Sequence, residues 1–195
     1  SEKEILETLY QYKFIKLDKA NKKIFFKNGN WDIYNSLIIP PDFQVFASSG
    51  VSLNLRENGN IISYSPLSFL GSENKPIAIT NYGNVSNGIA VINANEISSF
   101  KYVNFYNMNN IQNSKIILTG GVTIYQSPVE IFNCIFNNSL AEDSLNIVRS
   151  NFKINNSIFN QSASDALDID FSKGSINNML IKNSLNDGLD ISGSK

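Results

Sequence analysis

Carboxylate side chains recur at a fixed spacing near the C-terminus, and they are the part of the sequence with the most chemical content. Three hexapeptides, EDSLNI at 142–147, SDALDI at 164–169 and NDGLDI at 186–191, begin 22 residues apart. Carboxylates in such a pattern can bind Ca²⁺, hydrogen-bond a polyhydroxylated ligand, or act as the acid and base of a hydrolysis. Which of these they do depends on the elements that position them.

A unit of 22 residues is too short to bury an apolar face alone, so neighbouring units must stack. In the clearest copy, apolar residues alternate with Asp over Leu167–Phe171, which predicts a short strand with one buried face. Further short strands are predicted around Ile176 and around Leu180, which leaves no room for a helix. The chain is therefore predicted to be all-β, with each unit forming one coil of a solenoid.

Earlier copies of the unit keep the same order of apolar residues at offsets of 22, 23 and 31 residues. The longest offset predicts a coil with an extended loop around Met108–Leu118, and long loops that project from solenoids often carry binding. Looser alternating runs further upstream predict earlier strands. These runs are Leu37–Ile39, Gln44–Phe46, Val51–Leu55, Ile61–Tyr64 and Ile77–Thr80.

We expect two regions, an N-terminal cap over residues 1–30 and a solenoid over residues 31–195. The cap is predicted to hold a short amphipathic helix within Glu2–Lys13 and a hairpin formed by Phe14–Leu17 and Lys23–Lys27. No cap is predicted at the other end, so we expect the natural protein to continue. An uncapped last coil would also permit end-to-end self-association.

The segment Leu37–Thr80, with its IIPP, GVSLNL and GSENKPIAIT runs, resembles the opening of right-handed parallel β-helix proteins of the pectin-lyase-like superfamily. The later NNSIF and NNMLI runs resemble the coil repeats of the same superfamily. The resemblance covers roughly residues 30–195 and implies a right-handed, single-stranded parallel β-helix. It implies no single function, because the superfamily includes polysaccharide lyases, hydrolases, uronate epimerases, phage tailspikes and non-catalytic surface modules.

Stacked coils would place equivalent side chains about 4.8 Å apart in columns. Asn133, Asn156 and Asn178 form one such column at the bend between the second and third strands. Their amides can bond to one another along the stack. As in the superfamily, we expect an inward-facing structural ladder.

Asp143, Asp165 and Asp187 form a second column just before the first strand of each coil. Like charges at this separation repel by roughly 1 kcal/mol per pair even in water, so something must offset the repulsion. Hydrogen bonds from turn amides, Ca²⁺ held by these three carboxylates, or a cationic or polyhydroxylated ligand are the alternatives. Ca²⁺ is the only cofactor considered.

A third column lies on the outer face of the first strand, where a ligand would be accessible. Its members are predicted to bind the ligand, and they are Asn146, Asp168 and Asp190, with Asp170 on the same side. Asp168, Asp170 and Asp190 are also candidate carboxylates of a hydrolase. Their membership of a repeating pattern favours a scaffold role, because catalytic groups normally break the local pattern.

A lyase or epimerase would instead need a base and a cation that neutralises the substrate acid group. Arg149, Lys173 and Tyr125 are the candidates near the Asp face, and Arg149 has the alternative of pairing with Asp170 or a turn carbonyl. Whether the chain is an enzyme stays open at this point. The non-catalytic interpretation is preferred.

Composition removes several other classes of function. Histidine is absent, which excludes the commonest catalytic acid–base and zinc ligand. The formal net charge of −1 comes with scattered Lys and Arg, so we expect no nucleic-acid partner. No apolar run is long enough for a membrane span, and the first residues lack the basic-then-apolar layout of a secretion signal. The single cysteine, Cys134, excludes an internal disulfide and is predicted to be a buried thiol.

These observations predict an extracellular or cell-surface β-helix module that binds carbohydrate or another surface along its polar Asp/Asn face without catalysis. The first alternative is a polysaccharide lyase, hydrolase or uronate epimerase that acts on an acidic glycan. The second is a purely structural spacer.

Overall fold

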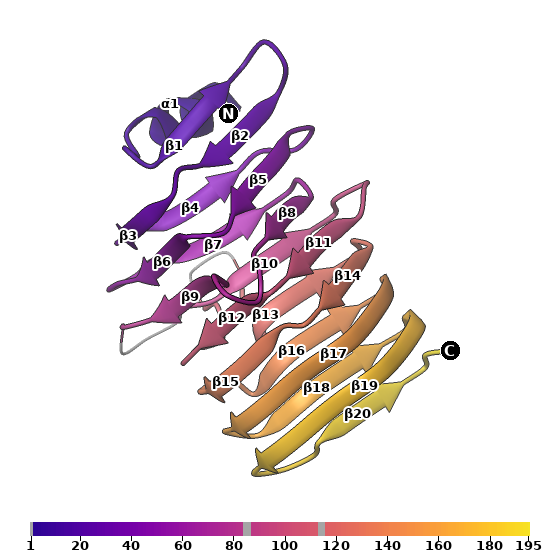
Figure 1. The fold of residues 1–195 in the computed structure, drawn as a ribbon. Coiled ribbons are helices and arrows are strands. Elements are labelled where there is room, and N and C mark those ends of the chain that lie inside the picture. The colour runs from indigo at the N-terminus through magenta and orange to yellow at the C-terminus, as the bar shows by residue number, and fades with distance from the viewer. Residues whose placement is uncertain (1, 84–86, 113–115) are drawn as a thin grey trace.

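Short apolar runs with a period of two residues stack coil upon coil into a parallel β-solenoid of about seven turns (Figure 1). This computed structural model describes residues 2–83, 87–112 and 116–195. Coils succeed one another along the axis, from the cap at the N-terminus to the last strands at the C-terminus. The predicted all-β parallel solenoid is confirmed.

One face of the solenoid is a seven-stranded parallel sheet. It consists of β4 (Ser36–Ile39), β7 (Asn60–Ser63), β10 (Ile89–Ile92), β13 (Gly120–Tyr125), β16 (Asp143–Val148), β18 (Asp165–Asp170) and β20 (Leu189–Ser192). The register is the one that the repeat predicts, since Leu145 pairs with Leu167 and Asn146 with Asp168. Asp168 in turn pairs with Asp190.

The other two faces belong to a thirteen-stranded sheet that bends around the solenoid. One face contains β2 (Lys23–Phe26), β5 (Gln44–Ser48), β8 (Leu67–Leu70), β11 (Ser98–Lys101) and β14 (Val129–Phe132). The other contains β3 (Gly29–Ile33), β6 (Val51–Leu55), β9 (Ile77–Asn81), β12 (Val103–Tyr106) and β15 (Ile135–Ser139). Two long strands, β17 (Asn151–Ser162) and β19 (Lys173–Ser184), run through both faces. The predicted second and third strands are therefore continuous in these last coils.

The N-terminal region has the predicted helix and hairpin. Helix α1 (Glu2–Tyr10) buries Leu6 and Leu9, and β1 (Ile15–Asp18) pairs antiparallel with β2. β2 also pairs in parallel with β5, so coil pairing begins at the hairpin. Across the described ranges, no helix has the length and apolar character needed to cross a bilayer.

Each complete coil turns three corners, and from Asn93 onward a residue with left-handed backbone occupies each of them. The first corner has Asn93, Gln126, Arg149, Phe171 and Gly193, with φ between 47 and 62°. The second has Tyr102, Asn133, Asn156 and Asn178, and the third has Asn107, Asn138, Gln161 and Asn183. Asn tolerates this conformation better than most residues, which gives its abundance a structural use.

The expected ladder of Asn133, Asn156 and Asn178 occupies the second corner but does not face inward. Asn178 and Asn156 are exposed, and Asn178 Nδ2 donates to Asn156 Oδ1 at 3.1 Å. Asn133 is half-buried. The prediction that the ladder faces inward was wrong, because the side chains of Asn156 and Asn178 are exposed to solvent.

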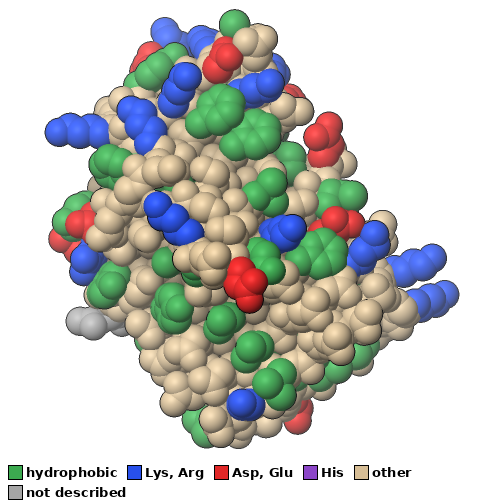
Figure 2. All heavy atoms as spheres, in the orientation of Figure 1, with side chains coloured by type: hydrophobic (Ala, Val, Ile, Leu, Met, Phe, Trp, Pro, Cys, Tyr) green, Lys and Arg blue, Asp and Glu red, His purple; other side chains and the backbone are tan. Residues whose placement is uncertain are grey.

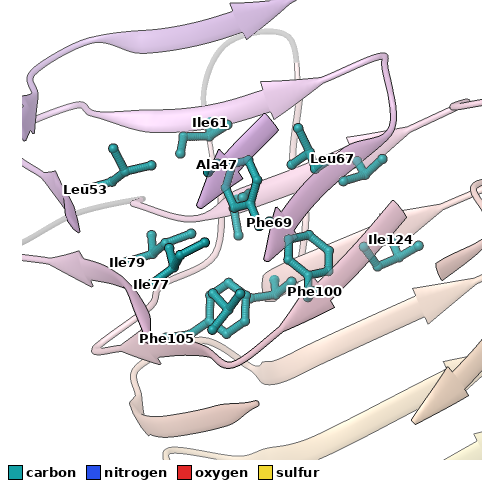
Figure 3. Packing of buried hydrophobic residues seen from close by; sticks show 14 of the residues in the cluster. Ala47, Leu53, Ile61, Leu67, Phe69, Ile77, Ile79, Phe100, Phe105 and Ile124 are labelled. Carbon is teal, nitrogen blue, oxygen red and sulfur yellow. The ribbon is translucent and has the colours of Figure 1, made fainter. Parts of the chain in front are cut away.

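Columns of apolar side chains fill the interior. Phe136 stacks between Phe105 and Phe159, with ring centroids 4.8 and 4.5 Å away. Figure 3 shows Phe69, Phe100 and Phe105 packed together with aliphatic residues from the surrounding strands. Cys134 is fully buried, as predicted, and burial raises the pKa of its thiol to about 12.

A buried serine ladder supplies the polar contacts between coils at the first corner. The hydroxyls of Ser127, Ser150, Ser172 and Ser194 accept the backbone N–H groups of Ala94, Ser127, Ser150 and Ser172, respectively, at 2.9–3.1 Å. Each hydroxyl also donates to a carbonyl two residues earlier. Sequence reasoning missed this ladder, although the four serines have the same 23- and 22-residue offsets as the Asp repeat.

Replacement of Ser172 with Ala is expected to lower the free energy of unfolding by roughly 1–3 kcal/mol, because the buried N–H of Ser150 loses its acceptor. Urea denaturation measures the change. Ser175→Ala is the matched control, since Ser175 is exposed near the start of β19, the strand that follows Ser172. Equal stabilities of the two variants would contradict a structural role for the ladder.

Candidate functional site

The outer face of the seven-stranded sheet changes from apolar to acidic along the solenoid. Strand pairing places seven residues in one outward column: Ile38, Ile62, Ala90, Thr123, Asn146, Asp168 and Asp190. The first three are apolar, and the last two carry carboxylates. Equivalent backbone positions therefore carry opposite chemistry at the two ends of the sheet.

The long loop after β12 covers the apolar part of this face. Ile62, Ala90 and Ile111 form a small buried cluster, separate from the main core, and Ile116 and Leu118 pack against it. The predicted loop around Met108–Leu118 is confirmed between β12 and β13, apart from residues 113–115, which lie outside the described residues. Because the loop ends beside β13, the acidic part of the sheet stays uncovered.

A groove of about 330 Å³ lies where the loop meets the uncovered strands, and we call it the acidic groove. Loop residues 117–119 line one side. The remaining lining residues are Thr123, Tyr125, Glu142, Asp143, Asn146, Val148, Asp168 and Asp170. Among the described lining residues there are four carboxylates and no Lys or Arg, so this part of the groove attracts cations and repels anions.

Asn146 joins two of the carboxylates. Its Nδ2 donates to Asp143 Oδ2 at 3.1 Å and to Asp168 Oδ2 at 2.9 Å. Asn146 and Asp143 are only 6% and 3% exposed, so both amide protons are used within the floor of the groove. The amide therefore separates two carboxylates that would otherwise face each other along the stack.

Burial and mutual repulsion raise two pKa values in the groove. The pKa of Asp168 rises from its ordinary value of 3.8 to about 7, mainly through burial and then through the charges of Asp143, Asp170, Asp190 and Asp165. Burial also raises the pKa of Asp143, although hydrogen bonds from Thr119 and Asn146 oppose the rise. A carboxyl group that titrates near neutrality can donate a proton as well as accept one.

The column of Asp143, Asp165 and Asp187 is divided between two environments. Asp143 lies in the buried floor, whereas Asp165 Oδ1 accepts the backbone N–H of Asp187 from the next coil at 2.9 Å. Asp165, Asp187 and Asp190 have carboxylate oxygens within 4.8 Å of one another and offer the geometry of a Ca²⁺ site. This group therefore includes Asp190, whereas the predicted Ca²⁺ ligands included Asp143 in its place.

Arg149 and Lys173 do not line the acidic groove. Both lie around the first corner, where they line a separate hollow of about 320 Å³. The guanidinium of Arg149 lies 5.9 Å from the ring centroid of Phe171, and no ion pair with Asp170 is present among the described residues. The structure therefore brings Asp168, Asp170 and Tyr125 together without the two cations that a lyase mechanism would need.

The sequence did not reveal that residues of the long loop form one side of the acidic groove. Thr119 and Glu142 belong to the groove, and Ile117 is 72% exposed beside it. The 31-residue offset reveals that this coil has an insertion, but no sequence pattern states which face the insertion covers.

No family model, curated protein or solved structure matches the chain. The interpretation of the groove therefore depends on its own residues.

The raised pKa of Asp168 predicts that stability falls with rising pH. The folded state holds this proton more tightly than the unfolded chain, so the free energy of unfolding decreases as pH rises from 3.8 to about 7. Allowing for solvent screening of a half-buried group, we expect a decrease of roughly 1–2 kcal/mol.

Asp168→Asn should remove this dependence and raise stability at pH 8 by a similar amount, as measured by urea denaturation across the pH range. Asp42→Asn, at an exposed carboxylate distant in the fold, is the control. A pH profile of Asp168→Asn that matches the wild type would contradict the prediction.

Proposed function

We propose that the acidic groove binds an uncharged carbohydrate chain and that the protein is a non-catalytic glycan-binding module. The observation that carries the proposal is the groove itself, which combines several hydrogen-bonding side chains with the ring of Tyr125 and the exposed side chain of Ile117. Binding sites of this kind pair an apolar surface with a few converging polar groups.

The charge of the groove favours an uncharged glycan over an acidic one. A uronate carboxylate about 4 Å from one Asp would be repelled by about 1 kcal/mol in water and by about 4 kcal/mol near a protein surface. No cation among the lining residues offsets this repulsion. The acidic glycan considered from the sequence is thus the less favoured ligand of this groove.

The polar groups suit the hydroxyls of a sugar. Carboxylate side chains such as that of Asp170 accept hydrogen bonds from hydroxyl groups, and charge-assisted bonds are about twice as strong as neutral ones. The outward column advances by about 4.8 Å per coil, so an extended chain along the axis would pass the polar members Asn146, Asp168 and Asp190 on successive coils. The face of Tyr125 offers a contact for the C–H surface of a pyranose.

The proposal also includes a cellular location, a family relationship and self-association. Polymeric glycans are met mainly outside cells, so we place the module in the extracellular space or at the cell surface. Its coil length and its long loop support a relationship to the pectin-lyase-like superfamily. Exposed Leu185 and Ile191 on the last coil, 82% and 52% exposed, offer a surface for end-to-end self-association.

Binding is expected with soluble neutral oligosaccharides, screened by isothermal titration calorimetry at pH 8. Asp170→Ala should weaken the binding by about tenfold, because it removes one charge-assisted hydrogen bond. Asp42→Ala is the control on a distant surface and should leave affinity unchanged. Absence of any neutral ligand would contradict the proposal and would leave the spacer role as the better account.

The raised pKa of Asp168 favours one second candidate, hydrolysis of the bound glycan. With a pKa of about 7, Asp168 is partly protonated at neutral pH and can act as general acid, while Asp170 is the neighbouring carboxylate. This candidate predicts release of new reducing ends from a neutral polysaccharide, with loss of at least about a hundredfold in rate for Asp168→Asn. Unchanged substrate after prolonged incubation would exclude it.

A further inference from the structure

The first corner of the C-terminal coils carries an exposed aromatic ring on strained backbone. Phe171 has φ of 49° and is 63% exposed. Left-handed backbone is disfavoured for bulky residues, whereas Asn93 and Gly193 occupy the same corner in other coils. A large apolar side chain at such a position gains no burial to offset the strain, and residues of this kind concentrate at binding sites.

The cationic residues Arg149 and Lys173 line the same hollow as this ring. The guanidinium of Arg149 lies 5.9 Å from the Phe171 ring centroid, and Lys173 follows two residues after Phe171. Figure 2 shows Lys and Arg side chains that project together from one edge of the C-terminal half of the molecule. We call Arg149, Lys153, Phe171 and Lys173 the basic corner.

Two adjoining hollows make the basic corner concave. The larger, about 580 Å³, lies over β14, β17 and β19 and has the side chains of Ile97, Pro128 and Phe152 as its apolar part. The smaller, about 320 Å³, contains Arg149 and Phe171. The hollows share Asn151, Lys173 and Lys195, so a ligand can extend from one to the other.

The charge of these hollows is opposite to that of the acidic groove. Glu130 is the one acidic side chain among their described lining residues, and its Oε1 lies 3.0 Å from Lys153 Nζ. Arg149, Lys173 and Lys195 have no ion pair with another described side chain. A bound anion would therefore meet cations that are not already neutralised.

We propose that the basic corner binds a saccharide that carries an anionic group, at a site distinct from the acidic groove. The C–H face of the sugar ring packs on Phe171, since C–H groups carry positive partial charge and the face of an aromatic ring is negative. The carboxylate or sulfate accepts hydrogen bonds from Arg149 and Lys173, and Arg presents a planar fork that suits both anions. The apolar surface of the larger hollow accommodates the next sugar unit.

Calorimetric titrations with three oligosaccharides test whether the anionic group is a sulfate or a carboxylate. They are run at about 50 mM salt, where charge attraction is weakly screened. The oligosaccharides are a heparin-derived tetrasaccharide, trigalacturonate and the neutral maltotriose. Wild-type protein is expected to bind at least one of the two anionic sugars with a dissociation constant below about 1 mM, and the neutral sugar at least about tenfold more weakly at this corner.

Substitutions that copy the neighbouring coils test the assignment without new strain. Phe171→Asn introduces the residue found at 93, Arg149→Gln the residue found at 126, and Lys173→Asn the residue found at 151. Phe171→Asn and the double variant Arg149→Gln/Lys173→Asn should each weaken anionic binding by about tenfold. Phe171→Asn should leave the salt dependence unchanged, because it removes no charge.

Lys182→Asn is the matched control, since Lys182 pairs with Asn160 on another face of the same coil. It should retain affinity within about twofold. Equal losses in Lys182→Asn and Lys173→Asn, or no anionic binding by the wild type, would overturn the proposal. The acidic groove repels anionic sugars, so Asp170→Ala should bind them as the wild type does.

Discussion

The stacking of coils depends on one backbone constraint, which is that the chain must turn the same three corners in every coil. From Asn93 onward each corner has a residue in left-handed conformation, and the near-regular spacing of these residues over the last coils accompanies the matched register of their strands. If a corner slipped by one residue, every following side chain would move to the opposite face of its strand. The interior phenylalanines and the serine ladder stabilise this arrangement only because the corners have already aligned them.

Because the coils are aligned, the inward and outward side chains of the strands meet different requirements. Inward columns must fill the interior, so they keep apolar residues from the first coil to the last. Outward columns are free to change, and the one that begins at Ile38 ends at Asp190. The loop after β12 covers the apolar part of that column, and the acidic groove begins where the covering ends.

The same alignment concentrates charge. Parallel stacking brings equivalent carboxylates within about 5 Å, where they repel one another and hold protons more tightly. The amide of Asn146 donates to Asp143 on its own strand and to Asp168 on the next coil. Around the first corner, the stack places Lys173 beside Asn151 and Arg149 beside Phe171. One side of the molecule thus presents two surfaces of opposite charge.

The sequence by itself determines the coil. Its 22-residue repeat, alternating apolar residues and outward Asp168 and Asp190 predict the parallel solenoid and the strand pairing, because a register set by local periodicity repeats with each unit. The inward Asn ladder was wrong because sequence spacing does not reveal that Asn156 and Asn178 are exposed at the corner. Only the tertiary structure decides which face the loop covers, how Asp143 becomes buried, and that Arg149 lies apart from the carboxylates. Those outcomes depend on contacts between coils, which no single unit of the sequence contains.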